Sequence, residues 1–541
     1  MANLLAGRTP PFEVAVGPHP FVDYRFVHAG QPRWLDADGA AIHYFGLGSP
    51  DHVHSAHAGI PHGIDLQVQS ASRSEPILTC TEPWEHQNGT PTIIYDGGVY
   101  RMWYFALSPD FWDPAEASSI GWGPAYGHFL CYAESDDGFE WRKPALGLYE
   151  WQGHDTNIVF GRELAGEAGL HGSSVFLDPV APAHERYRQM YMGRVSADVV
   201  RRWVREHPNR VDPWISIPDR HRGMFMATSP DGIRWTTHPD PVLIYLSDTC
   251  NVVDWNNERQ CYVWYSRGWT WDRRTITRTE SPDVFNWQLP TPVLTVPPVQ
   301  VPVTDIYTSG KVTYPGDSTT HLMFPTLYDR SLDTTTLAVA SSPDDLAWNW
   351  VPGGPVLEPG PTGSFDEGCL FSAKGLALLP GGQIGAPYTG YNVPHKYPRH
   401  QLRTQSAWAM WPQGRIAGLV CDGEGGFDTP ALALQGKELR VNVRTSGDGE
   451  LRVSVLIQSD RVRYDYGGEE PPPNSGPSKW TPRVGHGGFV ELCTSRPING
   501  DHLAIPVHWE GESLPKISSY GPVVLRFQMR HATLFGFELD A

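Results

Sequence analysis

Five segments of the chain place apolar runs on both sides of a short polar centre, which is the pattern of two strands joined by a turn. Each flank is rich in β-branched and aromatic residues, and each centre holds Gly, Pro, Asp or Asn, as β-hairpins require. The segments are 92–106, 174–193, 251–268, 310–328 and 375–392. The pattern predicts five hairpins through the middle of the chain.

A short line of sequence follows four of these hairpins. The copies read SDDGFEW, SPDGIRW, SPDVFNW and SPDDLAW, with an aspartate two residues after the serine. The serine and tryptophan pairs are Ser135 and Trp141, Ser229 and Trp235, Ser281 and Trp287, and Ser342 and Trp348. The intervals between the serines, 94, 52 and 61 residues, are near or above the roughly 40–50 residues of a four-stranded propeller blade. Five hairpins and four such lines predict a five-bladed β-propeller, whereas the alternative is a β-sandwich with chance similarity.

The organisation expected from these patterns is all-β, with three parts. Residues 1–75 form an N-terminal extension with short strands, 76–411 the five-bladed β-propeller catalytic domain, and 412–541 a β-sandwich. The sandwich is indicated by 439–458 and 523–539, where apolar and polar residues alternate as in half-buried strands.

Charge and cysteine content narrow the class of protein. The chain of 541 residues has a formal net charge of −18, so nucleic acid and an anionic membrane are unfavourable partners. Its 7 cysteines form no close-spaced pairs, and no run of about 18 apolar residues or signal-like N-terminal segment is present. A reduced, cytoplasmic protein is therefore expected, and the possibility of a homo-oligomer is left open.

A histidine-rich stretch, with His52, His54, His57 and His62, precedes the propeller. Histidine binds zinc or copper. No cysteine or carboxylate at fixed spacing accompanies these histidines, so a polar loop is favoured over a metal site. We expect no cofactor, with a structural calcium ion left open.

Acidic residues recur where the inner strands of the blades are expected to begin. The inner strands of a propeller surround a central channel, so their starting ends meet at one mouth. These positions hold Glu85, His171, Asp248, Asp305 and the pair Asp366 and Glu367. A single acid of this kind is more often a turn cap or an arginine partner, but acids at four equivalent places predict one pocket. Glu85, Asp248, Asp305 and Glu367 are the candidate catalytic residues.

Residues near the same strand ends are candidates for binding substrate. They are Trp84, His171, Arg267, Trp269, Tyr307, Asp366 and His395. The aspartates of the four repeated lines are expected to be structural, and their tryptophans are expected to pack between blades without touching ligand.

The layout resembles the five-bladed propeller glycoside hydrolases of families 43 and 32 and their uncharacterised bacterial relatives. The resemblance rests on the Pro83-Trp84-Glu85, Ser247-Asp248-Thr249 and Thr304–Thr308 starts, the SPDGxxW lines and the trailing sandwich. It implies that acids of blades one, three and four act as base or nucleophile, pKa modulator and general acid, which by position are Glu85, Asp248 and Asp305. The general acid of these families is usually Glu, whereas blade four here has Asp305 and Glu367 lies in blade five. Six-bladed sialidases share the repeated lines and use a tyrosine nucleophile with three arginines, but the hairpin count and the acids disfavour them.

The function expected from the sequence is a glycoside hydrolase or transglycosylase acting on a furanoside or small oligosaccharide. Such catalysis needs one carboxylic acid to protonate the leaving oxygen and a second carboxylate as base or nucleophile. The alternatives are a non-catalytic carbohydrate-binding propeller and a scaffold that binds protein on its rim. The expected partner is a carbohydrate.

Overall fold

The computed structural model describes residues 11–30, 33–35, 41–42, 54–56, 60–108, 128–165, 169–212, 221–296, 304–397, 401–458, 489–509, 513–519 and 521–541. The chain divides into two compact units, Met1–Gln67 with Gly414–Ala541, and Val68–Gln413. The architecture is all-β, a five-bladed propeller in the second unit and a β-sandwich in the first.

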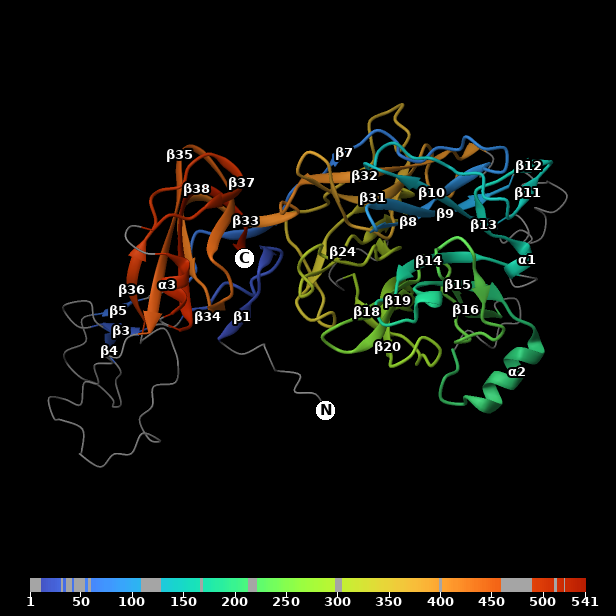
Figure 1. Ribbon diagram of the computed structural model, residues 1–541, viewed down its shortest axis with the longest axis horizontal. Coiled ribbons are helices and arrows are strands. Elements are labelled where there is room, and N and C mark those ends of the chain that lie inside the picture. Colours follow the sequence, from blue (N-terminus) through green and yellow to red (C-terminus); the bar gives the residue numbers. More distant parts are fainter. Residues whose placement is uncertain are drawn as a thin grey trace. The chain divides into compact units, whose positions relative to one another are not determined.

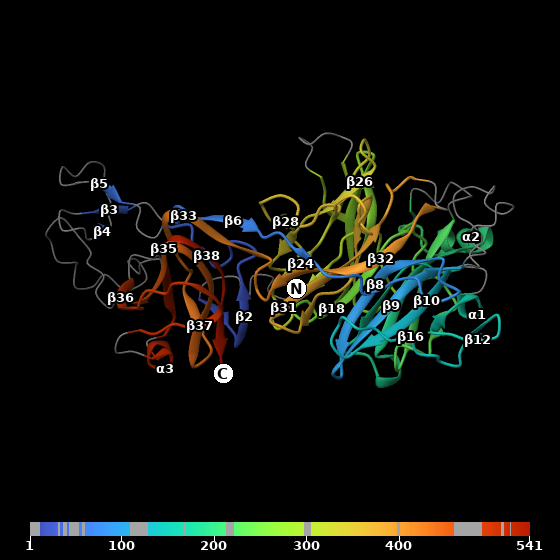
Figure 2. The same cartoon turned by 90° about the horizontal axis from the view of Figure 1, so that it is seen from above.

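Three blades of the propeller are regular antiparallel four-stranded sheets, in which each strand pairs with the next along the chain. In blade one, β8, β9 and β10 lie side by side in both views (Figures 1 and 2). Blade one consists of β8 (Gln87–Asp96), β9 (Val99–Leu107), β10 (His128–Ser135) and β13 (Ile158–Phe160). Blade two consists of β14 (His171–Leu177), β15 (Tyr187–Arg194), β16 (Arg222–Ser229) and β17 (Thr236–Thr237). Blade three consists of β18 (Val252–Asn256), β19 (Cys261–Thr270), β20 (Arg273–Ser281) and β21 (Thr291–Leu294).

Blade four follows the same course but is interrupted midway, so that its strands form two short sheets. Pro325 separates β24 from β25, and a proline cannot donate a ladder hydrogen bond. The chain remains paired across this break, because Tyr307 N–H donates to the Thr326 carbonyl (2.7 Å). One sheet consists of β22 (Thr304–Ile306), β25 (Thr326–Asp329) and β26 (Thr334–Leu337). The other consists of β23 (Val312–Thr313), β24 (His321–Met323), β27 (Ala340–Ser342) and β28 (Asn349–Trp350).

Blade five takes a strand from the opposite end of the propeller segment. β7 (Ser72–Arg73) precedes blade one, yet it pairs with the strand β32 of the last blade, Ser72 opposite Met410 and Arg73 opposite Ala409. The other strands are β29 (Cys369–Ser372), β30 (Ala377–Leu379), β31 (Gln383–Tyr391) and β32 (Thr404–Pro412). The last blade is thus completed by residues that come before the first.

Hydrogen bonds join each blade to the next around the ring. They run from Val175 N to Thr92 Oγ1, Asn251 N to Gly172 O, Arg274 N to Asp305 Oδ1, Leu370 N to Thr335 Oγ1, and Ile93 N to Lys374 O. The last of these connects blade five with blade one. The five inner strands therefore surround a common axis with their starting ends at the same mouth, as a propeller requires.

The four repeated lines form similar turns, and the contacts in these turns explain why the serine, aspartate and tryptophan recur. In the first copy Asp137 Oδ1 accepts the backbone N–H groups of Phe139 and Glu140 and the Ser135 hydroxyl, which is an Asx-type turn. The tryptophans belong to apolar clusters built from two neighbouring blades, as predicted, and none lines the cavity described below. Trp141, Trp235, Trp287 and Trp348 pack at the successive interfaces 5–1, 1–2, 2–3 and 3–4.

The strands of the sandwich are joined by hydrogen bonds into one nine-stranded sheet, with bulges in its long strands. Phe21, Phe427, Phe527 and Phe537 meet in its core, with Phe427 and Phe527 stacked at 5.0 Å. The strands are β1 (Phe12–Val14), β2 (Gly17–Pro20), β6 (Asp65–Val68), β33 (Ala417–Asp428), β34 (Leu432–Leu434), β35 (Glu438–Gln458), β36 (Phe489–Thr494), β37 (Asp501–Pro506) and β38 (Val523–Asp540). Because β1 pairs with β34 and β2 with β38, the strands expected in a separate extension at 1–75 belong to this unit.

The remaining elements are short. They are β3 (Arg33–Leu35), β4 (Ala41–Ile42), β5 (His54–Ala56), β11 (Glu150–Trp151), β12 (His154–Asp155), α1 (Arg162–Ala165), the 3-10 turn Ala183–Glu185, α2 (Ala197–Glu206) and α3 (Leu514–Ser518). Of the histidine-rich stretch, His52 and His57 lie outside the described residues. His62 is exposed, with its ring 3.2 Å from the Ile60 carbonyl.

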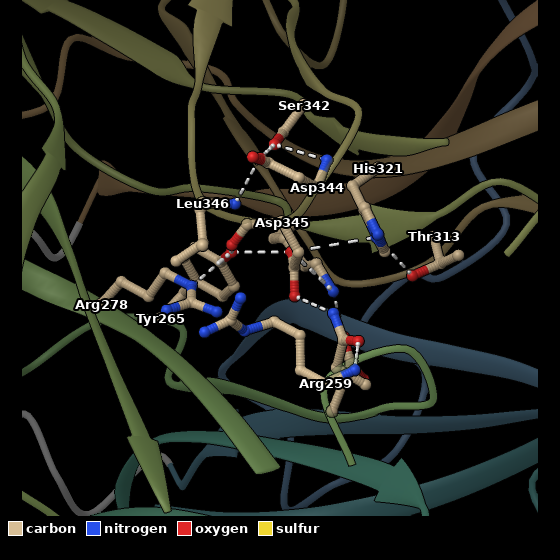
Figure 3. A network of polar contacts seen from close by, with 12 residues as sticks. Arg259, Tyr265, Arg278, Thr313, His321, Ser342, Asp344, Asp345 and Leu346 are labelled. Carbon is tan, nitrogen blue, oxygen red and sulfur yellow. Dashed lines mark hydrogen bonds and ion pairs between the residues drawn. The ribbon is translucent and has the colours of Figure 1, made fainter. Parts of the chain in front are cut away.

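A network of polar and ionic contacts around the buried Asp345 joins blades three and four (Figure 3). Asp345 accepts hydrogen bonds from Tyr265 (2.7 Å) and Asn256 (2.9 Å), and Lys311 lies 3.5 Å from it. Lys311 also pairs with Asp254, 3.3 Å away. Burial alone would raise the pKa of the Asp345 carboxyl, but the charges of Lys311, His321 and Arg278 and the hydrogen bond from Tyr265 together outweigh burial, and the net pKa lies below its usual value.

Trp287→Ala should strongly destabilise the propeller, because Trp287 is 0% exposed and fills the interface between blades two and three. Large-to-small changes at such sites cost about 3–5 kcal/mol. Calorimetry should show a lower melting temperature for the propeller. Trp271→Ala is the matched control, because Trp271 is 88% exposed, and an equal loss in both variants would contradict the packing role.

Asp345→Asn should destabilise by about 3–5 kcal/mol, because it leaves Lys311 with less compensation in a buried site. The stabilisation by Asp345 is present above the usual pKa of 3.8 and is lost as the pH falls through the lower folded value. Urea titrations should therefore show a smaller acid-induced loss in the variant than in the wild type. Asp345→Asn combined with Lys311→Met should recover part of the loss. A double variant no more stable than the single one would argue against the pair.

Candidate functional site

One cavity of about 480 Å³ lies where the inner strands begin, and all five blades line it. Its wall combines aromatic side chains, amides, hydroxyls and basic groups. The lining includes Gln87, Asn88, Thr90, Phe105, His128, His171, Arg194, Arg222, Asp248, Thr249, Arg274, Tyr307, Phe371, Thr389, Tyr391, His395, Lys396 and Thr404. Their convergence follows from the arrangement of the strands around one axis.

Four of the predicted residues line this cavity: His171, Asp248, Tyr307 and His395. Arg267 contacts two of them, because it forms an ion pair with Asp248 and its guanidinium lies 4.7 Å from the centre of the Tyr307 ring. His171 begins β14, and Asp248 and Tyr307 lie near the starts of β18 and β22, whereas His395 follows β31.

The expectation that four carboxylates face one another across this pocket is wrong, because only Asp248 is among the lining residues. Glu85 is buried in blade one, where Lys143 (2.7 Å), the Tyr104 hydroxyl (2.5 Å) and the Thr81 N–H bind it. Glu367 lies outside the cavity and accepts the Gly363 N–H (2.7 Å). Both carboxylates are therefore bound by groups of the protein itself, Glu85 within blade one and Glu367 in a local turn.

Asp305 and Asp366 are fully buried, and each is already in an ion pair. Asp305 is bound by the guanidinium groups of Arg274 and Arg330, both at 2.6 Å. Burial alone would raise the pKa of Asp305, but Arg330 and Arg274 outweigh it and hold the pKa below its usual value, which keeps Asp305 ionised. Asp366 pairs with Arg73 (3.0 Å) and is not among the residues that line the cavity, in contrast to its predicted place in the site.

The two predicted tryptophans also lie outside the lining. Trp84 is buried in the core of blade one, and its indole N–H donates to Asn157 (3.0 Å). Trp269 is partly exposed and stacks with the Arg274 guanidinium, whose centre lies 4.7 Å from the ring. Trp269 therefore positions a lining residue instead of contacting the cavity.

Basic residues dominate the charge of the lining and were not predicted, apart from the histidines. They are Arg194, Arg222, Arg274 and Lys396. Arg194 ends β15 and Arg222 begins β16, where the two residues pair in register. In antiparallel blades the second strand ends and the third begins at the mouth where the first begins. An arginine at each of these places was a usable signal in the sequence.

Burial and neighbouring positive charge lower the pKa of two guanidinium groups at the wall of the cavity. Burial lowers the pKa of the Arg222 guanidinium, and the charge of Arg194 lowers it further. Burial also lowers the pKa of Arg267, which Tyr307 partly opposes and Arg274 reinforces. Positive charge is thus concentrated in a partly desolvated wall.

Asn88 on β8 is a second lining residue that the sequence analysis missed. Its side chain is only 2% exposed, and among the described residues neither its amide nitrogen nor its amide oxygen has a hydrogen-bond partner. An unsatisfied buried amide costs about 1–3 kcal/mol and calls for a ligand or an ordered water. This amide therefore presents one donor group and one acceptor at the cavity.

His128 and His171 are neutral at pH 7, because the pKa of each ring lies below its ordinary value. Burial lowers the pKa of His128 to about 4, and burial with the charges around it lowers that of His171 well below its usual value. The rings of His128 and His171 lie 5.4 Å apart. His128 Nδ1 lies 2.8 Å from the Leu170 carbonyl, which can only accept, so Nδ1 carries the proton.

Among the described residues, no group of three or more His, Cys, Asp or Glu side chains could hold a metal ion. The structural calcium ion that the sequence analysis left open is not tested by this finding. No helix in the described parts of the chain is long and apolar enough to cross a membrane.

No protein family model matches this chain. Residues of Uncharacterized protein Rv1502 of Mycobacterium tuberculosis align with it at 28% identity over 99 positions, which is 18% of this chain and 29% of that protein. Uncharacterized protein MT1551 of the same species aligns with the same figures. The chain thus matches less than a third of the length of these curated relatives.

Solved structures that resemble the chain include glycoside hydrolases of families 43 and 32, in agreement with the resemblance stated from the sequence. A thermostable family 43 glycoside hydrolase is 11% identical, covering 61% of this chain and 92% of its own, with a TM-score of 0.38. The family 32 β-fructofuranosidase of Bombyx mori is 11% identical, covering 86% and 95%, with a TM-score of 0.37. An N-acetylgalactosamine deacetylase from F. plautii is 12% identical, covering 65% and 97%, with a TM-score of 0.41. The strand pairing of this chain itself shows the propeller architecture.

His128→Gln should reduce the loss of stability on acidification. The unfolded ring binds a proton near pH 6.5, whereas the folded ring does so only near pH 4, so stability is full above pH 6.5 and falls toward pH 4. Melting temperatures measured from pH 7 to pH 4 should fall less in the variant. His171 shifts in the same direction, so part of the pH dependence should remain. An NMR titration of His128 with a midpoint near 6.5 would contradict the burial argument.

Proposed function

We propose that the protein is a carbohydrate-active enzyme that cleaves or transfers a glycosidic bond in the propeller cavity. The observation that carries this proposal is the unsatisfied amide of Asn88, which faces a cavity walled by aromatic rings and polar side chains. A sugar offers hydroxyl groups that both donate and accept, so one hydroxyl pair would satisfy both ends of this amide. The rings of Phe105, Phe371 and Tyr391 provide apolar surface for the faces of a sugar.

The size of the cavity supports a small substrate. A volume of about 480 Å³ lies in the range of about 300–1,000 Å³ typical of small-molecule sites. A furanoside or the end of a short oligosaccharide is the substrate that we propose. Asp248 is the carboxyl group of the lining, so we assign to it proton exchange with the leaving oxygen.

One observation favours a second function, a carbohydrate-binding propeller without catalysis. Hydrolysis by the usual route needs two carboxyl groups on opposite sides of the scissile bond. The described lining contains only Asp248, and this residue is paired with Arg267. The two functions differ in turnover, so a panel of methyl furanosides and short oligosaccharides, neutral and carboxylate-bearing, tested for both binding and product formation, distinguishes them.

Asn88→Leu should weaken sugar binding without destabilising the fold. Loss of hydrogen bonds from the amide should cost about 1–3 kcal/mol, or about 5- to 150-fold in Kd. Leucine removes an unsatisfied buried amide, so the melting temperature should stay equal or rise, as at other sites where function costs stability. Calorimetric titration with the sugars that the wild type binds measures the first effect, and thermal unfolding the second.

The matched control is Asn257→Leu, the same change at an exposed turn. It should leave sugar affinity unaltered. Wild-type affinity in Asn88→Leu, or a fall in its melting temperature, would count against the proposal.

A further inference from the structure

The hairpin between β19 and β20 presents two tryptophans to solvent at the mouth of the cavity. Trp269 is 40% exposed and Trp271 is 88% exposed, whereas the tryptophans of the repeated lines pack between blades. Because β19 runs antiparallel to the inner strand β18, its end lies at the mouth where β18 begins. The two rings therefore stand beside the cavity and contribute little to the core of the propeller.

The backbone of this turn is unfavourable for the residues that it holds. Thr270 and Arg273 still pair, so Trp271 and Asp272 alone make the turn, with φ values of 55° and 58°. Two left-handed residues in succession are typical of a type I′ turn, which favours Asn, Asp or Gly and disfavours a bulky side chain. A strained backbone that carries an exposed aromatic ring indicates a role in binding.

Trp269 connects this turn with the wall of the cavity. The Arg274 guanidinium centre lies 4.7 Å from the centre of the Trp269 ring and 5.0 Å from that of the Tyr307 ring. Arg274 and Tyr307 line the cavity, and the carboxylate of Asp305 holds the Arg274 guanidinium in an ion pair (2.6 Å). A row of flat groups thus leads from the cavity to the exposed turn.

The neighbouring blades add exposed apolar side chains at the same mouth. Leu332 lies in the turn between β25 and β26, Tyr397 lies in the loop after β31, and both are exposed. The Arg330 guanidinium donates to the Asp272 carbonyl (2.7 Å), which joins the turn of blade four to that of blade three. The Asp333 carboxylate accepts the backbone N–H of the residue before Tyr397 (2.8 Å), which joins blade four to the loop of blade five. These contacts hold the exposed side chains in one arc.

The arc lies where the connections between second and third strands are shortest. Blade three has the turn of Trp271 and Asp272, and blade four has the turn between Asp329 and Thr334. The corresponding connections of blades one, two and five are longer, 108–127, 195–221 and 392–403. A ligand that extends out of the cavity therefore meets the shortest connections over blades three and four.

Resting on the proposed function, we infer that the substrate is a sugar chain, and that an aromatic rim of Trp269, Trp271, Leu332 and Tyr397 binds the units next to the one in the cavity. The C–H faces of a sugar ring are apolar and pack on an aromatic ring, while the hydroxyl groups at its edge stay in water. Tryptophan offers such a surface at a small loss of conformational entropy, since it has two side-chain torsions. The continuity of the rim with the cavity favours a glycan that reaches over both, instead of a separate protein partner.

The test compares arabinofuranose and fructofuranose oligosaccharides of increasing length with the matching methyl furanosides. In the wild type, the Kd of a pentasaccharide should be about 10-fold or more below that of its methyl furanoside, because exposed tryptophans at binding surfaces are frequent hot spots. Trp271→Asn should bring this ratio of Kd values toward one. Asparagine suits the turn better than tryptophan does, so the melting temperature should stay equal or rise. A merely structural role of Trp271 would lower the melting temperature instead.

Two further variants and a footprint sharpen the result. Trp271→Tyr keeps an aromatic ring and should retain most of the ratio. Tyr95→Asn removes an exposed ring near the end of β8, at the other mouth of the propeller, and should leave the ratio unaltered. Radical footprinting read by mass spectrometry should find that the pentasaccharide slows oxidation of Trp269 and Trp271, whereas the methyl furanoside does not.

The outcomes distinguish this inference from the proposed function. Equal affinity for pentasaccharide and methyl furanoside, an unchanged ratio in Trp271→Asn, or oxidation of both tryptophans at the same rate with and without pentasaccharide would each overturn the inference while leaving a carbohydrate-active protein. An unchanged ratio together with slower association of the variant into oligomers in ultracentrifugation would assign the rim to contact between copies of the chain. A wild type that binds none of these sugars would overturn both.

Discussion

The pairing of β7 with β32 closes the propeller into a ring. This pairing fastens residues that precede blade one to the last blade, and Arg73 adds an ion pair to Asp366, which the Tyr388 hydroxyl also binds (2.9 Å). A ring closed in this way holds five inner strands around one axis. Without closure, blades one and five would not share a boundary, and Asn88 would not lie beside Thr404 and Thr389 in one cavity wall.

Apolar packing and ion pairs between blades stabilise the ring in addition to its closure by β7. The tryptophans of the repeated lines fill the interfaces between successive blades, while Lys311, Asp254 and Asp345 join blades three and four by ion pairs. Asp345 has a φ of 58° at the position where two other repeats have Gly138 and Gly232. A non-glycine residue in this region is strained, and the ion pair and hydrogen bonds of Asp345 offset that strain.

Ion pairing between neighbouring strands also determines the charge of the cavity. Most acids near the inner strand starts are consumed by cations from neighbouring strands, which leaves a cavity that is basic and poor in carboxylates. Asp305 is the clearest case, since it receives two guanidinium groups from different blades. Among the described lining residues Asp248 is the one carboxylate, and it lies beside several basic side chains.

The periodic features of this protein could be predicted from its sequence. Hairpins, the Asx turns of the repeated lines and the interfacial tryptophans depend on residues close in the chain, and local patterning is enough to specify them. The expected strand ends also included His171, Asp248, Tyr307 and His395, which line the cavity. Which charged groups meet, in contrast, depends on how the blades are assembled. Glu85 and Lys143, Arg73 and Asp366, and Arg267 and Asp248 are brought together by blade packing and ring closure, and an ion pair depends on distances that no local pattern records. For the same reason the basic character of the cavity and the unsatisfied amide of Asn88 emerged only once the five blades were assembled around one axis.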